Sequence, residues 1–192
     1  MKLGDAATIR TGLVLSRKEA RGLPGVRYPL LNLRSVNPKG YIDLEQVGVY
    51  DSKERLAPEY LSQIGDIIVR LSIPYTAVVI NDVTAGMVIS SNFAIIRVDC
   101  KKLIPEYLSW LINTAETKKA IYGKTGSNMI GAIKASFFSE FEVTLLPLDD
   151  QRKIADMNRI AIEESNLLHQ LADERGKYYS LIIKNVYKEM RG

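Results

Sequence analysis

The chain has 192 residues, of which 46% are hydrophobic and 25% charged, a composition typical of a globular protein. The length favours one domain, or one domain with an appendage. No apolar run approaches the roughly 20 residues of a membrane span, and the first residues lack the apolar core of a signal peptide. The single cysteine excludes an internal disulfide, so we expect a cytoplasmic protein with no membrane contact.

The net charge of +4 is unevenly distributed. Residues 1–40 hold eight Lys or Arg and two acids, whereas residues 41–66 hold two bases and six acids. Residues 117–135 hold four lysines and no acid. Two basic segments in one domain could form one face for a polyanion such as nucleic acid, although a solvated surface would have the same pattern.

Runs of β-branched residues separated by turn signals predict a multi-stranded core. They cover residues 26–33, 66–71, 76–80, 87–89 and 93–98. Asn81-Asp82 fits a hairpin turn between two of these runs. A further apolar run, 141–146, predicts a strand that Pro147 would end.

The periodicity changes at Ile104. From there to Ile112 the apolar residues follow the spacing of one helical face, with Pro105 at a position suited to the first turn. The polar, glycine-containing stretch 123–128 would then end the helix as a basic loop. The sequence therefore predicts an α+β fold, with a strand-rich globular domain over residues 1–147.

After Pro147 we expect one long helix over residues 149–190, capped by Asp149 or Asp150. Its apolar or small residues form a stripe: Ile154, Met157, Ala161, Leu168, Leu171, Tyr178, Ile182 and Val186. Such a stripe must be covered, and a partner helix is favoured over folding back across the chain's own domain. Heptad spacing from Ile154 places Arg175 and Glu189 on the seam, so a perfect coiled coil is not indicated.

No catalytic constellation is found. One histidine, His169, and one cysteine, Cys100, cannot build a His/Cys metal site, so we expect no metal and no cofactor. Gly123-Lys124-Thr125 lacks the first glycine of a phosphate-binding loop, because Lys118 stands at that position. The sequence indicates a binding module rather than an enzyme.

Four segments, in order, resemble the specificity (S) subunit of type I restriction–modification systems. They are Leu3-Gly4-Asp5 with Thr11-Gly12, then Tyr28–Leu33 through Gly40–Ile42, then Gly65–Val69, and finally Ile104–Leu108 through Gly126-Ser127 with Leu146–Leu148 and Gln151–Ala155. The resemblance covers nearly the whole chain. Asp150 stands where the family usually has Glu, which keeps the charge. A typical member has two recognition domains, each followed by a long helix, so we expect a half-length form.

The resemblance implies a non-catalytic subunit. Residues 1–147 would be a target-recognition domain for double-stranded DNA, and residues 148–192 a helical spacer that pairs in a coiled-coil-like homodimer. Methyltransferase (M) subunits are the expected partners, joined by restriction (R) subunits in the full complex. Antiparallel pairing about a twofold axis implies a bipartite, palindromic target. The alternative is an assembly or decoy protein that binds M subunits through its helix without reading DNA.

Basic and polar side chains in three segments are the candidates for contacts with phosphates and base edges. They are Arg17, Lys18 and Arg21 after Gly12, then Arg70, Ser72 and Tyr75 at the end of one strand, and Lys124, Ser127 and Asn128 in the glycine loop. Each could instead be a solvated loop residue. The predicted dimerisation residues are Ile154, Met157, Ala161, Leu168, Leu171, Tyr178 and Ile182.

Overall fold

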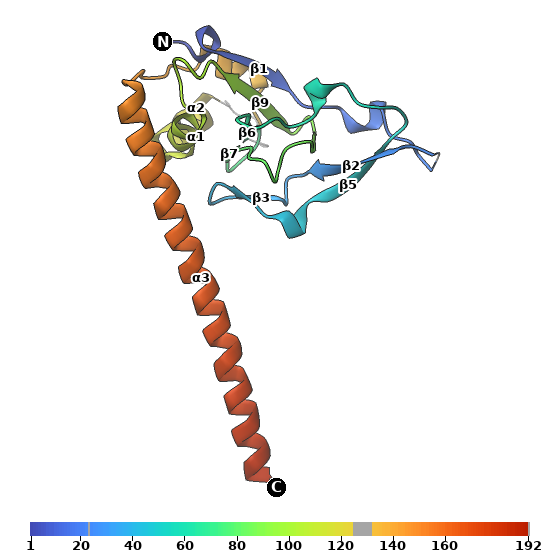
Figure 1. The fold of residues 1–192 in the computed structure, drawn as a ribbon, viewed down its shortest axis with the longest axis vertical. Coiled ribbons are helices and arrows are strands. Elements are labelled where there is room, and N and C mark those ends of the chain that lie inside the picture. The colour runs from blue at the N-terminus through green and yellow to red at the C-terminus, as the bar shows by residue number, and fades with distance from the viewer. Residues whose placement is uncertain (23, 125–131, 192) are drawn as a thin grey trace. The chain divides into compact units, whose positions relative to one another are not determined.

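The computed structural model describes residues 1–22, 24–124 and 132–191 (Figure 1). The chain divides into two compact units, Met1–Ala155 and Asp156–Gly192. We call the first the globular unit. The second consists of the greater part of one helix, and we call its residues 156–191 the arm.

A four-stranded antiparallel sheet forms the centre of the globular unit, in the order β1-β9-β6-β7 (Figure 1). Its strands are β1 (Ala7–Thr11), β6 (Ile67–Arg70), β7 (Ala77–Val79) and β9 (Phe93–Val98). In β6, Ile67, Ile68 and Val69 are all fully buried. Both faces of this strand are therefore covered, which explains why its sequence is a continuous apolar run without alternation.

A second sheet has the order β5-β2-β8, and a separate hairpin joins β3 to β4. The strands are β2 (Val26–Leu31), β5 (Gly48–Ser52), β8 (Val88–Ile89), β3 (Val36–Asn37) and β4 (Tyr41–Ile42). Strand β2 runs antiparallel to β5 and parallel to β8. Gly40, at φ 91°, supplies the left-handed residue that the β3–β4 turn requires.

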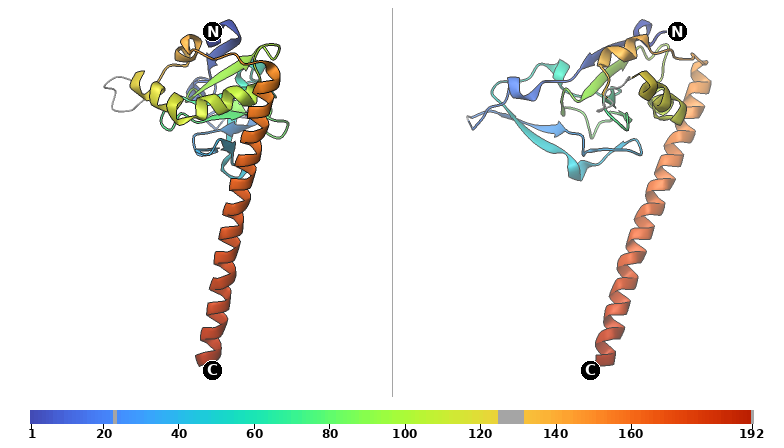
Figure 2. Two further views of the ribbon diagram at one scale, coloured as in Figure 1. Left: turned by 90° about the vertical axis from the view of Figure 1, so that its left-hand side faces the viewer. Right: turned by 180° about the vertical axis from the view of Figure 1, so that it is seen from behind.

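Two consecutive helices, α1 (Pro105–Asn113) and α2 (Ala115–Lys124), complete the core (Figure 2). Thr114 separates them with an extended backbone, and its Oγ1 accepts a hydrogen bond from Thr117 N at 3.3 Å. The same hydroxyl donates to Leu111 O at 2.8 Å, so one side chain serves the end of α1 and the start of α2.

Within the described residues, five short 3-10 helices connect these elements: η1 (Leu3–Asp5), η2 (Leu15–Arg17), η3 (Leu44–Gln46), η4 (Pro58–Tyr60) and η5 (Ala135–Glu140). The N-terminal residues pair with the segment after η5, through Leu3 N to Phe141 O and Val143 N to Met1 O, both at 2.8 Å. The predicted strand at 141–146 is wrong. Only an isolated bridge between Lys2 and Glu142 forms, because the chain opposite turns into η1 at Leu3.

Three local expectations also fail. Asn81 and Thr84 form a turn, but β7 and β8 lie in different sheets, so this turn closes no hairpin. Gly123 and Lys124 belong to α2 rather than to a loop. Asp149 does not cap the long helix, since it lies inside the first turn and pairs with Arg152 at 3.1 Å.

Helix α3 runs without a break from Leu148 to Arg191, 44 residues or about 66 Å in length. Its first two turns belong to the globular unit and the rest is the arm. The predicted α+β fold, a strand-rich domain followed by a long C-terminal helix, is confirmed. Among the described helices, none is long and apolar enough to cross a membrane.

Candidate nucleic-acid interface and pairing arm

The first basic segment is fastened to β5. Lys53 N donates to Lys18 O at 2.8 Å, and Ala20 N donates to Asp51 O at 2.9 Å. Lys18 Nζ lies 2.5 Å from Glu54 Oε1. This hydrogen bond raises the pKa of Lys18 and lowers that of Glu54. An anionic ligand must therefore compete with a carboxylate for Lys18, which the sequence did not reveal.

Arg17 and Arg21 are both exposed. Arg21 lies in a turn with its backbone at φ 46°, followed by Gly22 at φ 83°, and its side chain is 72% exposed. Its closest carboxylate is Glu19 at 3.9 Å, a distance too long for a strong pair. These two arginines are available to a phosphate backbone.

The side chains of the second segment differ in burial: two are half-buried and one lies in the core. Arg70 ends β6 half-buried, and its guanidinium donates to Leu33 O and Ile73 O, both at 3.4 Å. Burial lowers the pKa of Arg70. Ser72 is half-buried, whereas Tyr75 is 2% exposed and packs in the main core. A core side chain cannot reach a base edge, so Tyr75 does not belong to the candidate interface.

The third segment begins at Lys124, which is exposed in the last turn of α2. Ser127 and Asn128 lie outside the described residues. The chain after them returns to the second segment, because Ile133 N donates to Leu71 O at 2.8 Å. The structure thus brings the flanks of the second and third segments together at the end of β6.

The first segment starts beside the same strand ends. Leu13 exchanges backbone hydrogen bonds with Ile89 and Ser91, both with donor–acceptor distances of 2.7–2.8 Å. Leu71 N in turn donates to Asn92 O at 3.0 Å. Backbone hydrogen bonds therefore connect the flanks of the three predicted segments, Leu13, Leu71 and Ile133, through residues 89–92, although Arg17 to Arg21 continue from there to β5.

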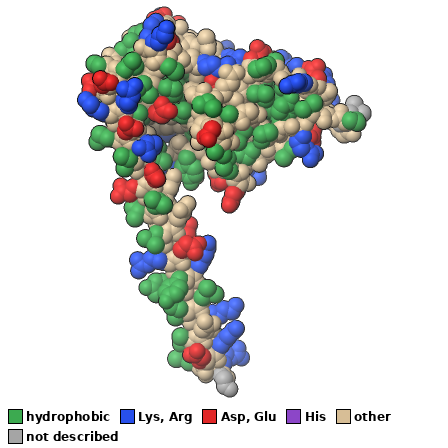
Figure 3. Space-filling view, in the orientation of Figure 1, with side chains coloured by type: hydrophobic (Ala, Val, Ile, Leu, Met, Phe, Trp, Pro, Cys, Tyr) green, Lys and Arg blue, Asp and Glu red, His purple; other side chains and the backbone are tan. Residues whose placement is uncertain are grey.

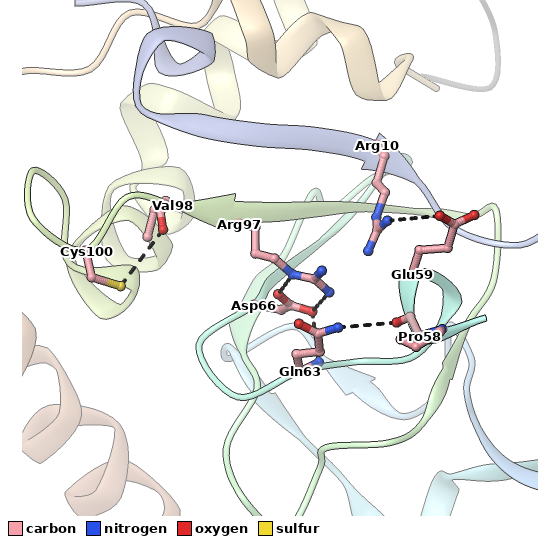
Figure 4. Close-up of polar contacts among 8 residues, drawn as sticks. All are labelled: Arg10, Pro58, Glu59, Gln63, Asp66, Arg97, Val98 and Cys100. Carbon is pink, nitrogen blue, oxygen red and sulfur yellow. Dashed lines mark hydrogen bonds and ion pairs between the residues drawn. The ribbon is translucent and has the colours of Figure 1, made fainter. Parts of the chain in front are cut away.

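Asp66, within the Gly65–Val69 motif, has a structural role (Figure 4). Its carboxylate accepts two hydrogen bonds from Arg97, Nε at 2.6 Å and Nη2 at 2.9 Å, and a third from Gln63 N at 2.8 Å. The contact with Asp66 raises the pKa of Arg97. Gly65 adopts φ 84°, which explains the glycine before the acid. This motif shapes the turn into β6.

Gln151 joins α3 to the globular unit. Its side chain is fully buried, accepts a hydrogen bond from Ile104 N at 2.8 Å, and donates to Lys102 O at 3.0 Å and Leu146 O at 2.8 Å. Ile154, one turn later, packs against the main core. Ile154 is half-buried, so part of the apolar surface of this predicted dimerisation residue is already covered by the globular unit.

The other predicted dimerisation residues lie exposed on the arm, where hydrophobic side chains are conspicuous in Figure 3. Met157 is 72% exposed, Leu171 56% and Tyr178 61%. Sequence inspection missed further large apolar residues of the arm, including Ile160, Leu167 and Leu181, which are 56–60% exposed. A shallow groove on the arm is lined by Ile160, Glu163, Glu164, Leu167, Leu168 and Leu171.

The fold is that of the specificity subunits of type I restriction–modification (R-M) systems. The HsdS subunit from Thermoanaerobacter tengcongensis matches with a TM-score of 0.67 and 17% identity, over 95% of this chain and 46% of that chain. A chain from a study of complex assembly and conformational transition of the type I R-M system also matches, with a TM-score of 0.67 and 17% identity, over 99% of this chain and 48% of that one.

The chain therefore spans about half the length of the solved structures that it matches. No protein-family model and no curated protein matches the sequence. The predicted resemblance to an S subunit is confirmed at the level of the fold.

Proposed function

We propose that this chain is a half-length specificity subunit of a type I restriction–modification system. It binds double-stranded DNA through the globular unit and directs M subunits, and in the full complex R subunits, to the target. It performs no chemistry itself. The observation that carries the proposal is the match of nearly the whole chain, globular unit and arm together, to HsdS structures.

Exposed arginines and lysines supply the affinity for DNA. Arg17, Arg21 and Lys124 are exposed and would neutralise phosphates, which fixes the register of the protein on the duplex. Arg70 and Ser72 lie where the strand ends converge, and they are the candidates for base edges. Ser127 and Asn128 keep this role on sequence grounds alone.

Two copies form the functional unit. The arm exposes a stripe of large apolar side chains, with Met157 and Leu171 both more than half exposed. Leaving so extended an apolar stripe in water is unfavourable, so a partner surface is expected to cover it. Antiparallel pairing about a twofold axis covers them and supplies the second recognition domain. Identical domains related by a twofold axis read inverted half-sites, so the target is bipartite and palindromic.

The test is the salt dependence of binding to random-sequence duplex, measured by fluorescence anisotropy. The double variant R17A/R21A should weaken binding to all sequences and flatten the slope of log K against log salt by about two. The matched control, K101A/K102A, removes two exposed lysines from the loop after β9 and should leave the slope unchanged.

Failure of the wild-type chain to bind any duplex at low salt would refute DNA reading and favour the assembly or decoy protein. Equal losses in both variants would show that the DNA face is wrongly placed. The bases read are then found by sequencing the methylome of a host with and without this chain, in the presence of its M subunit.

A further inference from the structure

Charge is divided between the two halves of the arm. Residues 156–173 hold four acids and one base, a net charge of −3. Residues 174–191 hold five bases and two acids, a net charge of +3. Two arms in antiparallel orientation place each acidic half against a basic half, whereas parallel arms place like charges together.

The apolar residues are divided in the same way. One block runs from Met157 to Leu171 and the other from Tyr178 to Met190, and all their large apolar side chains are exposed or half-exposed. Between them lies the polar segment Asp173-Glu174-Arg175-Gly176-Lys177. The two blocks flank this segment almost symmetrically, so the arm is complementary to an inverted copy of itself.

We propose that a second copy of this chain covers the apolar face in one register, with the twofold axis passing between Glu174 and Arg175. This inference rests on the proposed homodimer and specifies how its two arms align. In this register Leu171 faces Tyr178 of the partner subunit. Glu174 faces Arg175 of the partner subunit, so the polar segment meets its own inverted copy.

The same axis pairs the positions on either side of the polar segment by type. Leu168 faces Leu181 of the partner subunit, and Leu167 faces the partner's Ile182. Glu164 faces the partner's Asn185, which lies beside Lys184 and one turn from Lys188. At these positions apolar side chains meet apolar ones, and the acid inside the first block meets a polar, basic stretch. The match ends beyond them, where Ile160 faces the partner's Glu189.

Sliding one arm along the other by one heptad moves the axis by half a heptad and removes this match. With the axis at Leu171, Leu168 would face Glu174 and Glu164 would face Tyr178. With the axis at Tyr178, Leu171 would face Asn185 and Leu168 would face Lys188. Each shift buries charged or amide groups against apolar side chains, which is costly when they find no partner.

Cysteine crosslinking of the full chain tests the register. The background is Cys100→Ser, which removes the single native thiol, and the variants are L171C, Y178C and L171C/Y178C. Both positions are more than half exposed on the arm, so neither change disturbs the globular core. Residues seven apart in one helix are about 10 Å apart, too far for a disulfide within one chain.

The expected result is that neither single variant forms a covalent dimer under mild oxidation, whereas the double variant, and an equimolar mixture of the two singles, does. Crosslinking of L171C alone, or of Y178C alone, would mean that the arms pair one heptad out of the proposed register and would overturn it. Crosslinking of both singles would mean parallel arms. No crosslink in any variant would also overturn the register.

Charge reversal supplies an independent measurement. E163K/E164K should weaken self-association about tenfold, and mixing it with K184E/K188E should restore pairing as a heterodimer, followed by sedimentation. The anisotropy assay on the same samples separates the two proposals. Duplex binding without crosslinking overturns the register alone, whereas correct crosslinking without duplex binding overturns DNA reading alone.

Discussion

Gln151 offers a sharp test of how α3 is held to the globular unit. Gln151→Met keeps a side chain of similar length and removes all three hydrogen bonds. Ile104 N and Leu146 O then lose a buried partner, while Lys102 O belongs to an exposed residue and can be hydrated. At about 1–3 kcal/mol for each buried group left unpaired, the expected loss is about 3 kcal/mol in the free energy of unfolding.

Urea unfolding followed by tryptophan fluorescence measures this loss. Trp110 is the single tryptophan and packs against the main core, so its emission reports the globular unit. For a unit of this size the expected change corresponds to a fall of roughly 6–12 °C in Tm. The control is Gln63→Met, because Gln63 is exposed and its amide makes one contact of 3.4 Å; it should change stability by less than about 0.5 kcal/mol.

A glutamate at position 151 gives a second test, through the pH dependence of stability. Gln151→Glu keeps the acceptor for Ile104 N but points a carboxylate at two carbonyl oxygens, which raises the pKa of the introduced acid in the folded state. Stability is then highest at low pH and falls as pH rises through that raised pKa. If both variants at 151 unfold at the same urea concentration as Gln63→Met, the proposed role of Gln151 is refuted.

Further outcomes follow from single contacts. Gly12→Ala should lower the free energy of unfolding by more than about 2 kcal/mol, because its methyl group would overlap the carbonyl oxygens of Ile89 and Ser90. Gly123→Ala, on open helix surface, should raise the free energy of unfolding by up to about 1 kcal/mol. Calorimetry measures both changes, and equal effects would contradict the close contact at Gly12. Phe138→Ala removes a fully buried ring and should cost about 3–5 kcal/mol by urea unfolding; a loss below 1 kcal/mol would count against it. Glu54→Gln should strengthen binding to random duplex and steepen its salt slope by about one, since Lys18 is released. The pKa of Glu54 is lowered, so its pairing with Lys18 holds above the ordinary carboxyl pKa and is lost as pH falls through the lowered pKa. The duplex affinity of the wild type should therefore approach that of Glu54→Gln in acid. A difference in affinity that stays constant with pH would exclude competition between Glu54 and DNA for Lys18.

The elements with strong periodicity could be predicted from sequence. The contiguous apolar run of β6 and the helical spacing after Ile104 appear where they were expected, as does the uninterrupted α3. The run 141–146 has the composition of a strand, but the chain opposite turns into η1 at Leu3 and offers it no strand to pair with. Strand formation is decided by a partner that the local sequence does not contain.

The candidate site was less predictable for a related reason. Tyr75 follows a strand as a surface residue would, yet its ring turns into the core. Lys18 is a basic loop residue in sequence, and only the fold places Glu54 against it. Gln151 has the composition of a solvated helix start, and no sequence signal marks the three backbone groups that surround it. Long-range contacts decide each of these cases.

The proposed pairing face lies within the arm and uses no residue of the globular unit. Two chains that share this arm but differ in their globular units would therefore associate as readily as two identical ones. In a cell with several such chains, mixed pairs would join unlike half-sites, and the repertoire of targets would grow by combination, without any change in the arm.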